Sequence, residues 1–297
     1  SPDGPEPETR TSAVPDSAPG AVDRTPKLYI GGKQKRPDGG YSRTVTGRSG
    51  AVLGEVAEAN RKDVRDAVEA ARKAAGWSAA TPHLRAQILY YLAENLDARR
   101  TEIAARLNAQ TETDGEAEVE GAVRRLFTYA AWTDKYDGRV QVPPLGHPGL
   151  ALALSEPVGV VGVLAPAEAP LLGLVSLAAP LIAMGNRVVL AVSEDAPLVA
   201  QDLYQALDTS DVPAGVLNLL TGDHAALAKT MGEHLDIDAV WCFGDAAEAV
   251  ERASSGNMKR TFTGLAKRID WFSAAAEGRP FLREATRVKT VWIPYGA

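Results

Sequence analysis

The chain has 297 residues, of which 45% are hydrophobic and 24% are charged, and its formal net charge is −6. Such a length can bury one large core or two modest ones, and the composition is ordinary for a globular protein. The negative net charge gives no reason to expect a nucleic-acid partner. The single cysteine, Cys242, excludes a disulfide within this sequence and is typical of a reducing compartment, so we expect a cytoplasmic protein.

Residues 1–26 hold six prolines and almost no large apolar side chains, which predicts a disordered tail. This segment lacks the basic and then apolar stretches of a signal peptide. The next segment, LYIGGKQ at residues 28–34, predicts a short strand that enters a glycine turn.

Three helices are predicted next. The first covers residues 62–75, with Asn60 as its N-cap and Gly76 as its stop. The second begins at Thr81 and Pro82, a cap followed by a proline in the first turn. Its apolar stripe consists of Leu84, Ile88, Leu92 and Leu96. The third covers residues 117–135, and the residues that we expect it to bury are Val119, Val123, Leu126, Phe127 and Ala130.

From residue 158 onward, short apolar runs alternate with helical patterns. The predicted strands lie in VGVVGVL, RVVLAV, GVLNLL and IDAVWCF. Nearly continuous apolar strands separated by helices predict an α/β fold with a doubly wound, Rossmann-like parallel sheet covered on both faces. Prolines and glycines interrupt the apolar run 158–184, which therefore predicts a buried strand and a buried helix, and no membrane span.

Several segments together resemble one known family. EPVGVVGVLAP, APLIAMGNRVVL and DVPAGVLNLLTG resemble, in order and spacing, the cofactor-binding domain of the NAD(P)-dependent aldehyde dehydrogenases. ANRKDVRDAVEAARKAAGW resembles the amino-terminal helices of this family, and TRVKTVWI resembles the strand that closes its oligomerisation flap. The resemblance implies a cofactor-binding domain over residues 27–264. Residues 265–297 are then a linker and a C-terminal oligomerisation strand.

The residues of the implied cofactor site depart from the family pattern. The family's Pro-Trp-Asn turn, whose Asn donates to the oxyanion, reads Pro166-Ala167-Glu168. The Lys-Pro-Ser-Glu segment that holds the adenine ribose ends here in Ser193-Glu194 and has lost its lysine. In the family, a Ser contacts the pyrophosphate; in this sequence the matching position is Asp245, whose negative charge would repel the pyrophosphate. The vestigial site implied by the resemblance comprises Pro166, Glu168, Ser193, Glu194, Gly222, Gly244 and Asp245.

The resemblance also implies that the catalytic domain is missing. The family's general-base Glu aligns with Gly264, and the sequence then runs within about thirty residues into VKTVWI, without the nucleophilic Cys. We expect Cys242 to be a buried core thiol, and we predict no catalytic residue. The four histidines lie far apart without partners at ligand spacing, so no metal site is predicted. The closest resemblance is to the second, non-catalytic domain of the two-domain family 16 aldehyde dehydrogenases.

Two functions follow from this resemblance. The first is an inactive structural or assembly partner of an active aldehyde dehydrogenase, or of a second copy of this chain, without a cofactor. The second is a degenerate dehydrogenase whose cleft still binds NAD, NADP or another ligand. The expected interface residues lie on the C-terminal strand and are Val288, Thr290, Val291, Trp292 and Ile293. The alternative is that this strand folds back on the chain's own small sheet.

Overall fold

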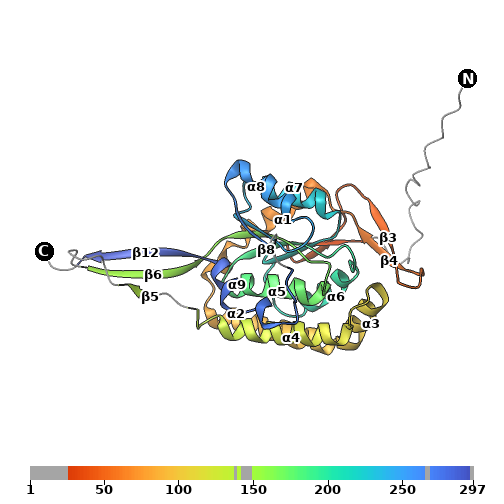
Figure 1. Cartoon of the computed structure of the whole chain (residues 1–297), viewed down its shortest axis with the longest axis horizontal. Coiled ribbons are helices and arrows are strands. Elements are labelled where there is room, and N and C mark those ends of the chain that lie inside the picture. Colours follow the sequence, from red (N-terminus) through yellow and green to blue (C-terminus); the bar gives the residue numbers. More distant parts are fainter. Residues whose placement is uncertain (1–25, 137–138, 142–148, 265–267, 295–297) are drawn as a thin grey trace, which may run out of the picture.

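The computed structural model describes residues 26–136, 139–141, 149–264 and 268–294, which form an α/β body with a projecting arm (Figure 1). The predicted tail at residues 1–26 therefore lies outside the described residues, apart from Pro26. The strands of the described part are β1 (Leu28–Ile30), β2 (Lys33–Lys35), β3 (Ser42–Thr46), β4 (Val52–Ala57), β5 (Arg139–Gln141), β6 (Gly149–Pro157), β7 (Val160–Leu164), β8 (Arg187–Ala191), β9 (Leu217–Leu220), β10 (Ala239–Cys242), β11 (Arg260–Thr263) and β12 (Thr286–Pro294).

The helices pack around a central sheet of seven strands. They are α1 (Arg61–Lys73), α2 (Pro82–Ala98), α3 (Arg100–Gln110), α4 (Gly115–Trp132), α5 (Pro170–Ala183), α6 (Val199–Asp208), α7 (His224–Glu233), α8 (Ala247–Ser254) and α9 (Arg279–Glu284). The strand order is β11-β10-β7-β8-β9-β1-β2, and the first five of these strands run parallel. The predicted doubly wound parallel sheet is thus confirmed. The hairpin β1–β2 extends it with antiparallel pairing, which we did not predict.

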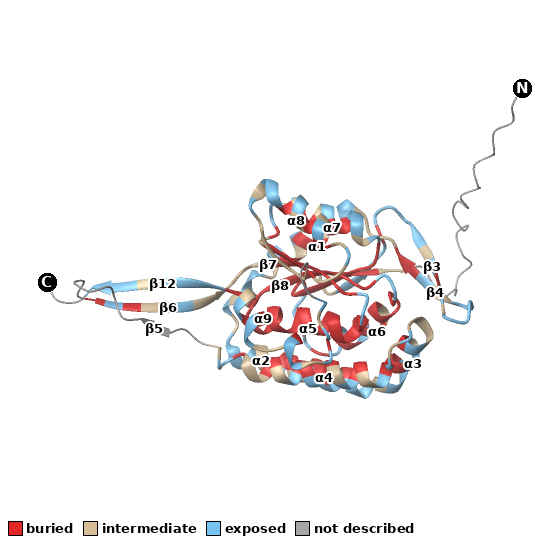
Figure 2. Cartoon of the chain, viewed as in Figure 1, coloured by how far each residue is buried: buried red, intermediate tan, exposed pale blue. Residues whose placement is uncertain are grey.

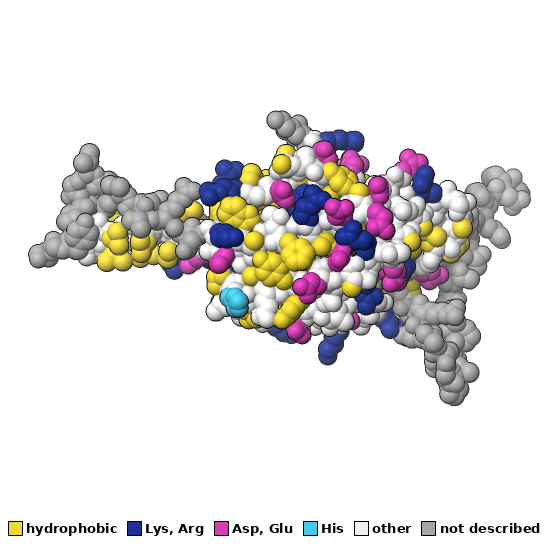
Figure 3. All heavy atoms as spheres, turned by 90° about the horizontal axis from the view of Figure 1, so that it is seen from below, with side chains coloured by type: hydrophobic (Ala, Val, Ile, Leu, Met, Phe, Trp, Pro, Cys, Tyr) yellow, Lys and Arg dark blue, Asp and Glu magenta, His cyan; other side chains and the backbone are white. Residues whose placement is uncertain are grey.

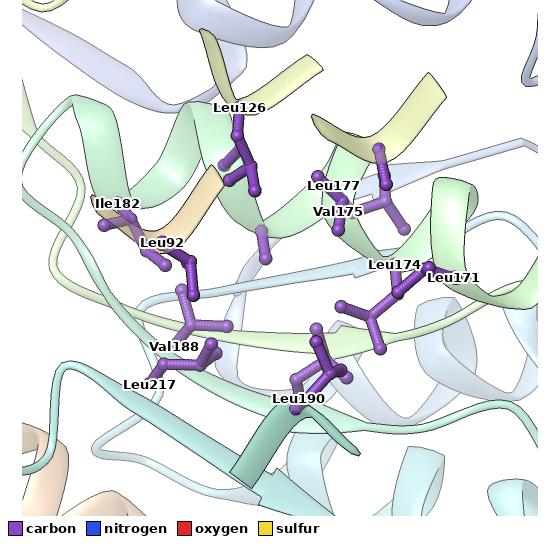
Figure 4. Close-up of a cluster of buried hydrophobic side chains, with 14 of the residues drawn as sticks. Leu92, Leu126, Leu171, Leu174, Val175, Leu177, Ile182, Val188, Leu190 and Leu217 are labelled. Atoms are coloured by element: carbon purple, nitrogen blue, oxygen red, sulfur yellow. The ribbon is translucent and has the colours of Figure 1, made fainter. Parts of the chain in front are cut away.

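Both faces of the central sheet are covered, as its fully buried strands require. Helices α1, α7 and α8 lie on one face, and α5, α6 and α9 lie on the other (Figure 1). Helices α2 and α4 form a further layer against α5. Figure 4 shows the resulting core, in which Leu92 of α2 and Leu126 of α4 point toward α5 and the sheet residues Val188 and Leu190. The run 158–184 forms β7 and the fully buried α5, as predicted.

The amino-terminal helices confirm the predicted caps. Asn60 accepts hydrogen bonds from the backbone N–H of Lys62 and Asp63, and the Asp63 carboxylate accepts from the N–H of Asn60, which completes a capping box. Thr81 caps α2. However, α1 ends at Lys73, before Gly76, which lies inside a 3₁₀ turn at Ala75–Ala79.

Two residues of the predicted apolar faces of these helices are exposed, contrary to expectation. Leu84 is 44% exposed and Phe127 is 38% exposed. Both follow the helical periodicity of buried residues, but their side chains remain partly accessible to solvent. Helix α3, the hairpin β3–β4 and strand β11 were also not predicted.

The arm is a separate antiparallel sheet in the order β12-β6-β5. Strand β12 pairs with β6 along its whole length, from Thr286 opposite Pro157 to Pro294 opposite Gly149. The C-terminal strand therefore folds onto this chain's own small sheet, which was the alternative that we considered. Its other edge has no strand partner within the described residues, and most of its side chains are exposed (Figure 2).

The expected linker before β12 is packed against the body over the part that the structure describes. Trp271 and Phe281 join Phe243 and Phe262 in an aromatic cluster at the ends of β10 and β11, with ring centroids 5.7 Å apart for Phe243–Trp271 and 5.6 Å for Phe262–Phe281. Such contacts add to the stability gained from burial alone. Residues 268–285 therefore cover the sheet's end and hold the base of the arm in place.

Candidate functional site

A cleft of about 710 Å³ opens where three parallel strands end. Ala165 follows β7, Ser193 lies two residues beyond β8, and Phe243 follows β10; all three residues line the cleft. The chain order in the sheet reverses between β7 and β10. In open α/β sheets ligands bind in the crevice at such a reversal point, so the position of this cleft is that of a binding site.

Five of the seven residues of the predicted vestigial site meet in this cleft. Its wall includes Glu168, Ser193, Glu194, Gly244 and Asp245. Their convergence follows from the parallel sheet, because the carboxyl ends of neighbouring strands share one edge.

The other two predicted residues, Pro166 and Gly222, do not line the cleft. Pro166 is buried beneath α5, where a Cβ added at Gly173 would lie 2.3 Å from its Cγ. Gly222 is buried against Ala59, with a backbone φ of 155°. Both residues shape the backbone behind the wall of the cleft.

The structure adds lining residues that we did not predict, among them Asp195, His224, Glu248 and Arg268. His224 follows β9, and this position after a parallel strand was the available signal for it. Its Nε2 lies 2.8 Å from the carbonyl oxygen of Val192. Because a carbonyl oxygen only accepts, Nε2 carries a proton and donates it to Val192.

The turn between β7 and α5 is held by a buried carboxylate. Helix α5 has no side-chain cap of its own, and its N-cap Ala169 has a left-handed φ of 49°. Glu118 of α4 supplies the cap, because its Oε2 accepts from the backbone N–H of Leu171 at 2.9 Å and of Leu172 at 3.2 Å. Burial raises the pKa of this Glu118 carboxyl above its usual range.

The charges of the cleft are mostly negative. Glu168 has an exposed ion pair at 3.5 Å with Arg268. Arg43 lies nearby, but its guanidinium contacts the backbone oxygen of Glu194 at 3.5 Å and the carboxylate of Glu58 at 2.7 Å. The carboxylate of Glu194 thus gains no ion pair from it. Asp245 lies just before α8, where the helix dipole favours a negative charge.

A comparison with known proteins identifies the family. Residues 37–266 match the model of the aldehyde dehydrogenase family. The chain belongs to this family. It is 32% identical over 243 residues to an aldehyde dehydrogenase of Aspergillus niger, covering 78% of this chain and 48% of that protein. It is 31% identical over 231 residues to the mitochondrial aldehyde dehydrogenase of Rattus norvegicus, covering 73% of this chain and 44% of the relative. The chain thus spans less than half the length of these curated relatives.

Solved structures of this family share the fold. An indole-3-acetaldehyde dehydrogenase in its apo form has a TM-score of 0.76 at 29% identity, covering 82% of this chain and 59% of that one. A betaine aldehyde dehydrogenase of Staphylococcus aureus in complex with NAD⁺ also has a TM-score of 0.76 at 23% identity. This match covers 80% of the present chain and 50% of the betaine aldehyde dehydrogenase chain. This second similarity concerns the fold alone.

The residues of the cleft do not fit the NAD(P) that the family implies. A pyrophosphate needs backbone N–H groups or cations, and helix amino termini usually supply the N–H groups. Here Glu118 takes the N–H groups of α5, and Asp245 places a carboxylate at the start of α8. Two like charges about 4 Å apart repel by about 4 kcal/mol at an effective dielectric constant of about 20. A dinucleotide would therefore meet repulsion where it needs hydrogen-bond donors.

The described part of the cleft also offers no thiol. Gly264, which aligns with the family's general base, lines the cleft and has no side chain. Cys242 is 1% exposed, and burial raises the pKa of its thiol to about 11. It is thus a core thiol, as predicted. Within the described residues, no three His, Cys, Asp or Glu side chains form a group that could hold a metal ion. No helix there combines the length and hydropathy of a membrane-spanning segment.

Proposed function

We propose that this chain is an inactive aldehyde dehydrogenase-like subunit or domain that assembles with a catalytic aldehyde dehydrogenase through its arm. The observation that carries the proposal is the edge of β12 that has no strand partner within the described residues. This strand exposes Val288 by 68%, Trp292 by 51% and Ile293 by 45%. Figure 3 shows hydrophobic side chains on the surface of the arm. An exposed apolar edge strand promotes association, and proteins usually cover it. Strand addition by a partner would give β12 that cover.

The two faces of the arm support this proposal. The pairing places Val291 and Ile293 opposite Leu152 and Leu150, so that these four aliphatic side chains share one face. Thr290 and Trp292 lie on the other face, opposite Ala153 and Ala151. A sheet of three strands needs a covered hydrophobic face for its stability, and a partner's surface would supply that cover.

The inactive character rests on the chemistry of this sequence. Aldehyde oxidation through a thioester needs an accessible thiolate, and the one cysteine of this sequence is buried. The proposed function does not include dinucleotide binding. The cleft is large and retains Glu194, but its other carboxylates would repel a pyrophosphate.

The assembly is tested by affinity purification of the full chain together with an aldehyde dehydrogenase of its native host. Removing residues 285–297 should release the dehydrogenase, and so should the single change Val288→Asp. Val52 provides the matched control, because it is also a strand valine with 68% exposure but lies on β4 in the body. Val52→Asp should leave the yield unchanged. Equal yields with Val288→Asp and Val52→Asp would reject the arm as the interface.

The same preparation tests the inactive character. The isolated chain should form no NADH or NADPH from an aldehyde above a buffer control. Heat-sensitive production of either cofactor by the purified chain would contradict this part of the proposal, whatever the outcome of the binding experiment.

A further inference from the structure

The residues of β12 complement one another when the strand is paired, antiparallel, with a second copy of itself. The strand runs from Thr286 to Pro294, and Thr290 is its middle residue. A two-fold axis through Thr290 would pair the whole strand of one copy with the whole strand of the other, whereas an axis at any other residue would leave part of it unpaired. Such a symmetric contact needs the same strand edge in both copies, and this edge of β12 has no strand partner within the described residues.

This register brings the exposed apolar residues of the strand together. The exposed Val288 of each copy would lie opposite the exposed Trp292 of the other copy. Cross-strand pairs of an aromatic and a β-branched residue stabilise a sheet. The two copies of Thr290, which is also exposed, would face each other at the axis, and threonine pairs are favourable across strands as well. The contact would therefore cover the apolar side chains that the isolated strand leaves in water.

The charges of the strand are compatible with the same register. Lys289 would lie opposite Val291 of the second copy, and Arg287 would lie opposite Ile293 of the second copy, so that no two cations are directly opposed. An axis through Lys289 would instead place two lysines opposite each other, which destabilises a sheet. Glu156 of β6 lies 3.1 Å from the Nζ of Lys289 and 3.7 Å from the Nε of Arg287, and it offsets part of their charge within each arm.

The shape of the molecule leaves room for this contact. Figure 1 shows that the arm projects away from the body. Because the paired strands run antiparallel, the body of each copy would lie beyond the tip of the other copy's arm. A strand of nine residues is about 30 Å long, since each residue adds about 3.3 Å. The two bodies would therefore lie at opposite ends of the shared sheet.

We propose that two copies of this chain associate through β12 into one antiparallel sheet, to which each copy contributes the three strands of its arm. The regulatory part of this inference rests on the proposed function: because both partners need the same edge of β12, self-association competes with binding of a catalytic aldehyde dehydrogenase. A contact between two single strands is small, and small interfaces are usually weak. At low concentration the chain is therefore monomeric, and the edge of β12 is open to the dehydrogenase.

The test is sedimentation velocity of the isolated full chain at increasing protein concentration, where the parent should shift from monomer to dimer. Thr290→Lys and Thr290→Glu should each weaken the dimer about fivefold, because like charges then face each other at the axis. An equimolar mixture of these two variants should restore the dimer, because opposite charges then face each other. Thr44→Lys is the matched control, since Thr44 is also an exposed strand threonine but lies on β3 in the body, and it should leave the dimer unchanged.

The possible outcomes separate self-association from the assembly with a dehydrogenase. A parent that stays monomeric at the highest attainable concentration would overturn self-association. Equal effects of Thr290→Lys and Thr44→Lys would do the same, and so would a mixture of the two position-290 variants that associates no better than either alone. The affinity purification with Val288→Asp tests the assembly independently. A monomeric parent that still captures the dehydrogenase retains the proposed function, whereas a dimeric parent that captures none retains only self-association.

Discussion

Asp202 shows how a single buried charge makes the stability of this fold depend on pH. It lies on α6, is 3% exposed and faces α3, where the Nε of Arg106 is 2.8 Å from its Oδ2. Burial raises its pKa from 3.8 to about 6, and the nearby charge of Arg106 offsets only part of this effect. Glu102 on α3 raises the pKa further, whereas Arg99 lowers it.

We expect Asp202→Asn to remove a pH dependence of the free energy of unfolding. The folded pKa of Asp202 lies above the unfolded one, so the folded state keeps a proton that the unfolded chain releases between about pH 3.8 and pH 6. Its contribution to stability is thus present below pH 3.8 and is lost as the pH rises through 6. Relative to Asp202→Asn, the parent should lose about 2–3 kcal/mol between pH 4 and pH 7. Urea unfolding of both proteins at pH 4 and pH 7 measures their free energies of unfolding. If the parent and Asp202→Asn differ by the same amount at both pH values, the prediction is contradicted.

At the level of single residues, the family resemblance indicated the residues of the cleft, and their positions after parallel strands explain why they meet. Ser193, Glu194, Gly244 and Asp245 follow the ends of β8 and β10, so their convergence follows from the parallel sheet. Glu118 was not predicted as part of the site. Its role depends on how α4 packs across α5, and no local pattern of the sequence encodes that packing.

At the scale of elements, periodicity predicted long helices and fully buried strands, and it failed for short, half-exposed ones. Strand β3 reads SRTVT and buries only Val45, so its hydrophobic signal was too weak to detect. Conversely, Leu84 and Phe127 have the periodicity of buried residues but are exposed. Periodicity gives the direction of an apolar face, whereas the neighbouring elements determine how far that face is covered.

The segment of residues 268–285 is fixed to the helices by one buried guanidinium. Arg125 of α4 donates to the carbonyl oxygens of Trp271 and Ala276 and to the Oγ of Ser176, and its Nε lies 3.0 Å from the carboxylate of Glu277. Removing it would leave these buried acceptors without a donor. The packing of residues 268–285 against the helices therefore depends on the hydrogen bonds of Arg125 as well as on the apolar contacts of Trp271 and Phe281.

We expect Arg125→Ala to lower the free energy of unfolding by about 3–5 kcal/mol, because two buried carbonyl oxygens and the partly exposed carboxylate of Glu277 lose their partner. The neighbouring Arg124 is the matched control, since its side chain is 72% exposed and makes only an i,i+4 pair with Glu120. Arg124→Ala should cost no more than about 0.5 kcal/mol. Urea denaturation measures both changes. If Arg125→Ala does not fold, Glu277→Gln provides a milder test. Equal losses for positions 124 and 125 would contradict the role of Arg125.

At the scale of the whole molecule, the body and the arm differ in how they are stabilised. The strands β7, β8 and β10 are buried on both faces, whereas β12 is mostly exposed (Figure 2). The arm combines β6, which precedes the five parallel strands of the central sheet in sequence, with β12, which follows them. The predicted boundary at residue 264 therefore divides the sequence but does not divide the arm from the body.

This difference predicts separate rates of amide hydrogen exchange in the two parts. Amides of β7 and β8 should exchange only through global unfolding, whereas those of β6 and β12 should exchange through local opening at a much lower free energy, because few buried contacts hold the arm closed. Adding a catalytic aldehyde dehydrogenase that binds the chain should slow exchange in β12. The hairpin β3–β4 is the internal control, since it also lies outside the central sheet and should not change. Mass spectrometry of peptides from each element measures these rates. Exchange in β12 of the isolated chain as slow as in β8 would show that the arm needs no partner for its stability, which would remove the physical basis of the proposed assembly.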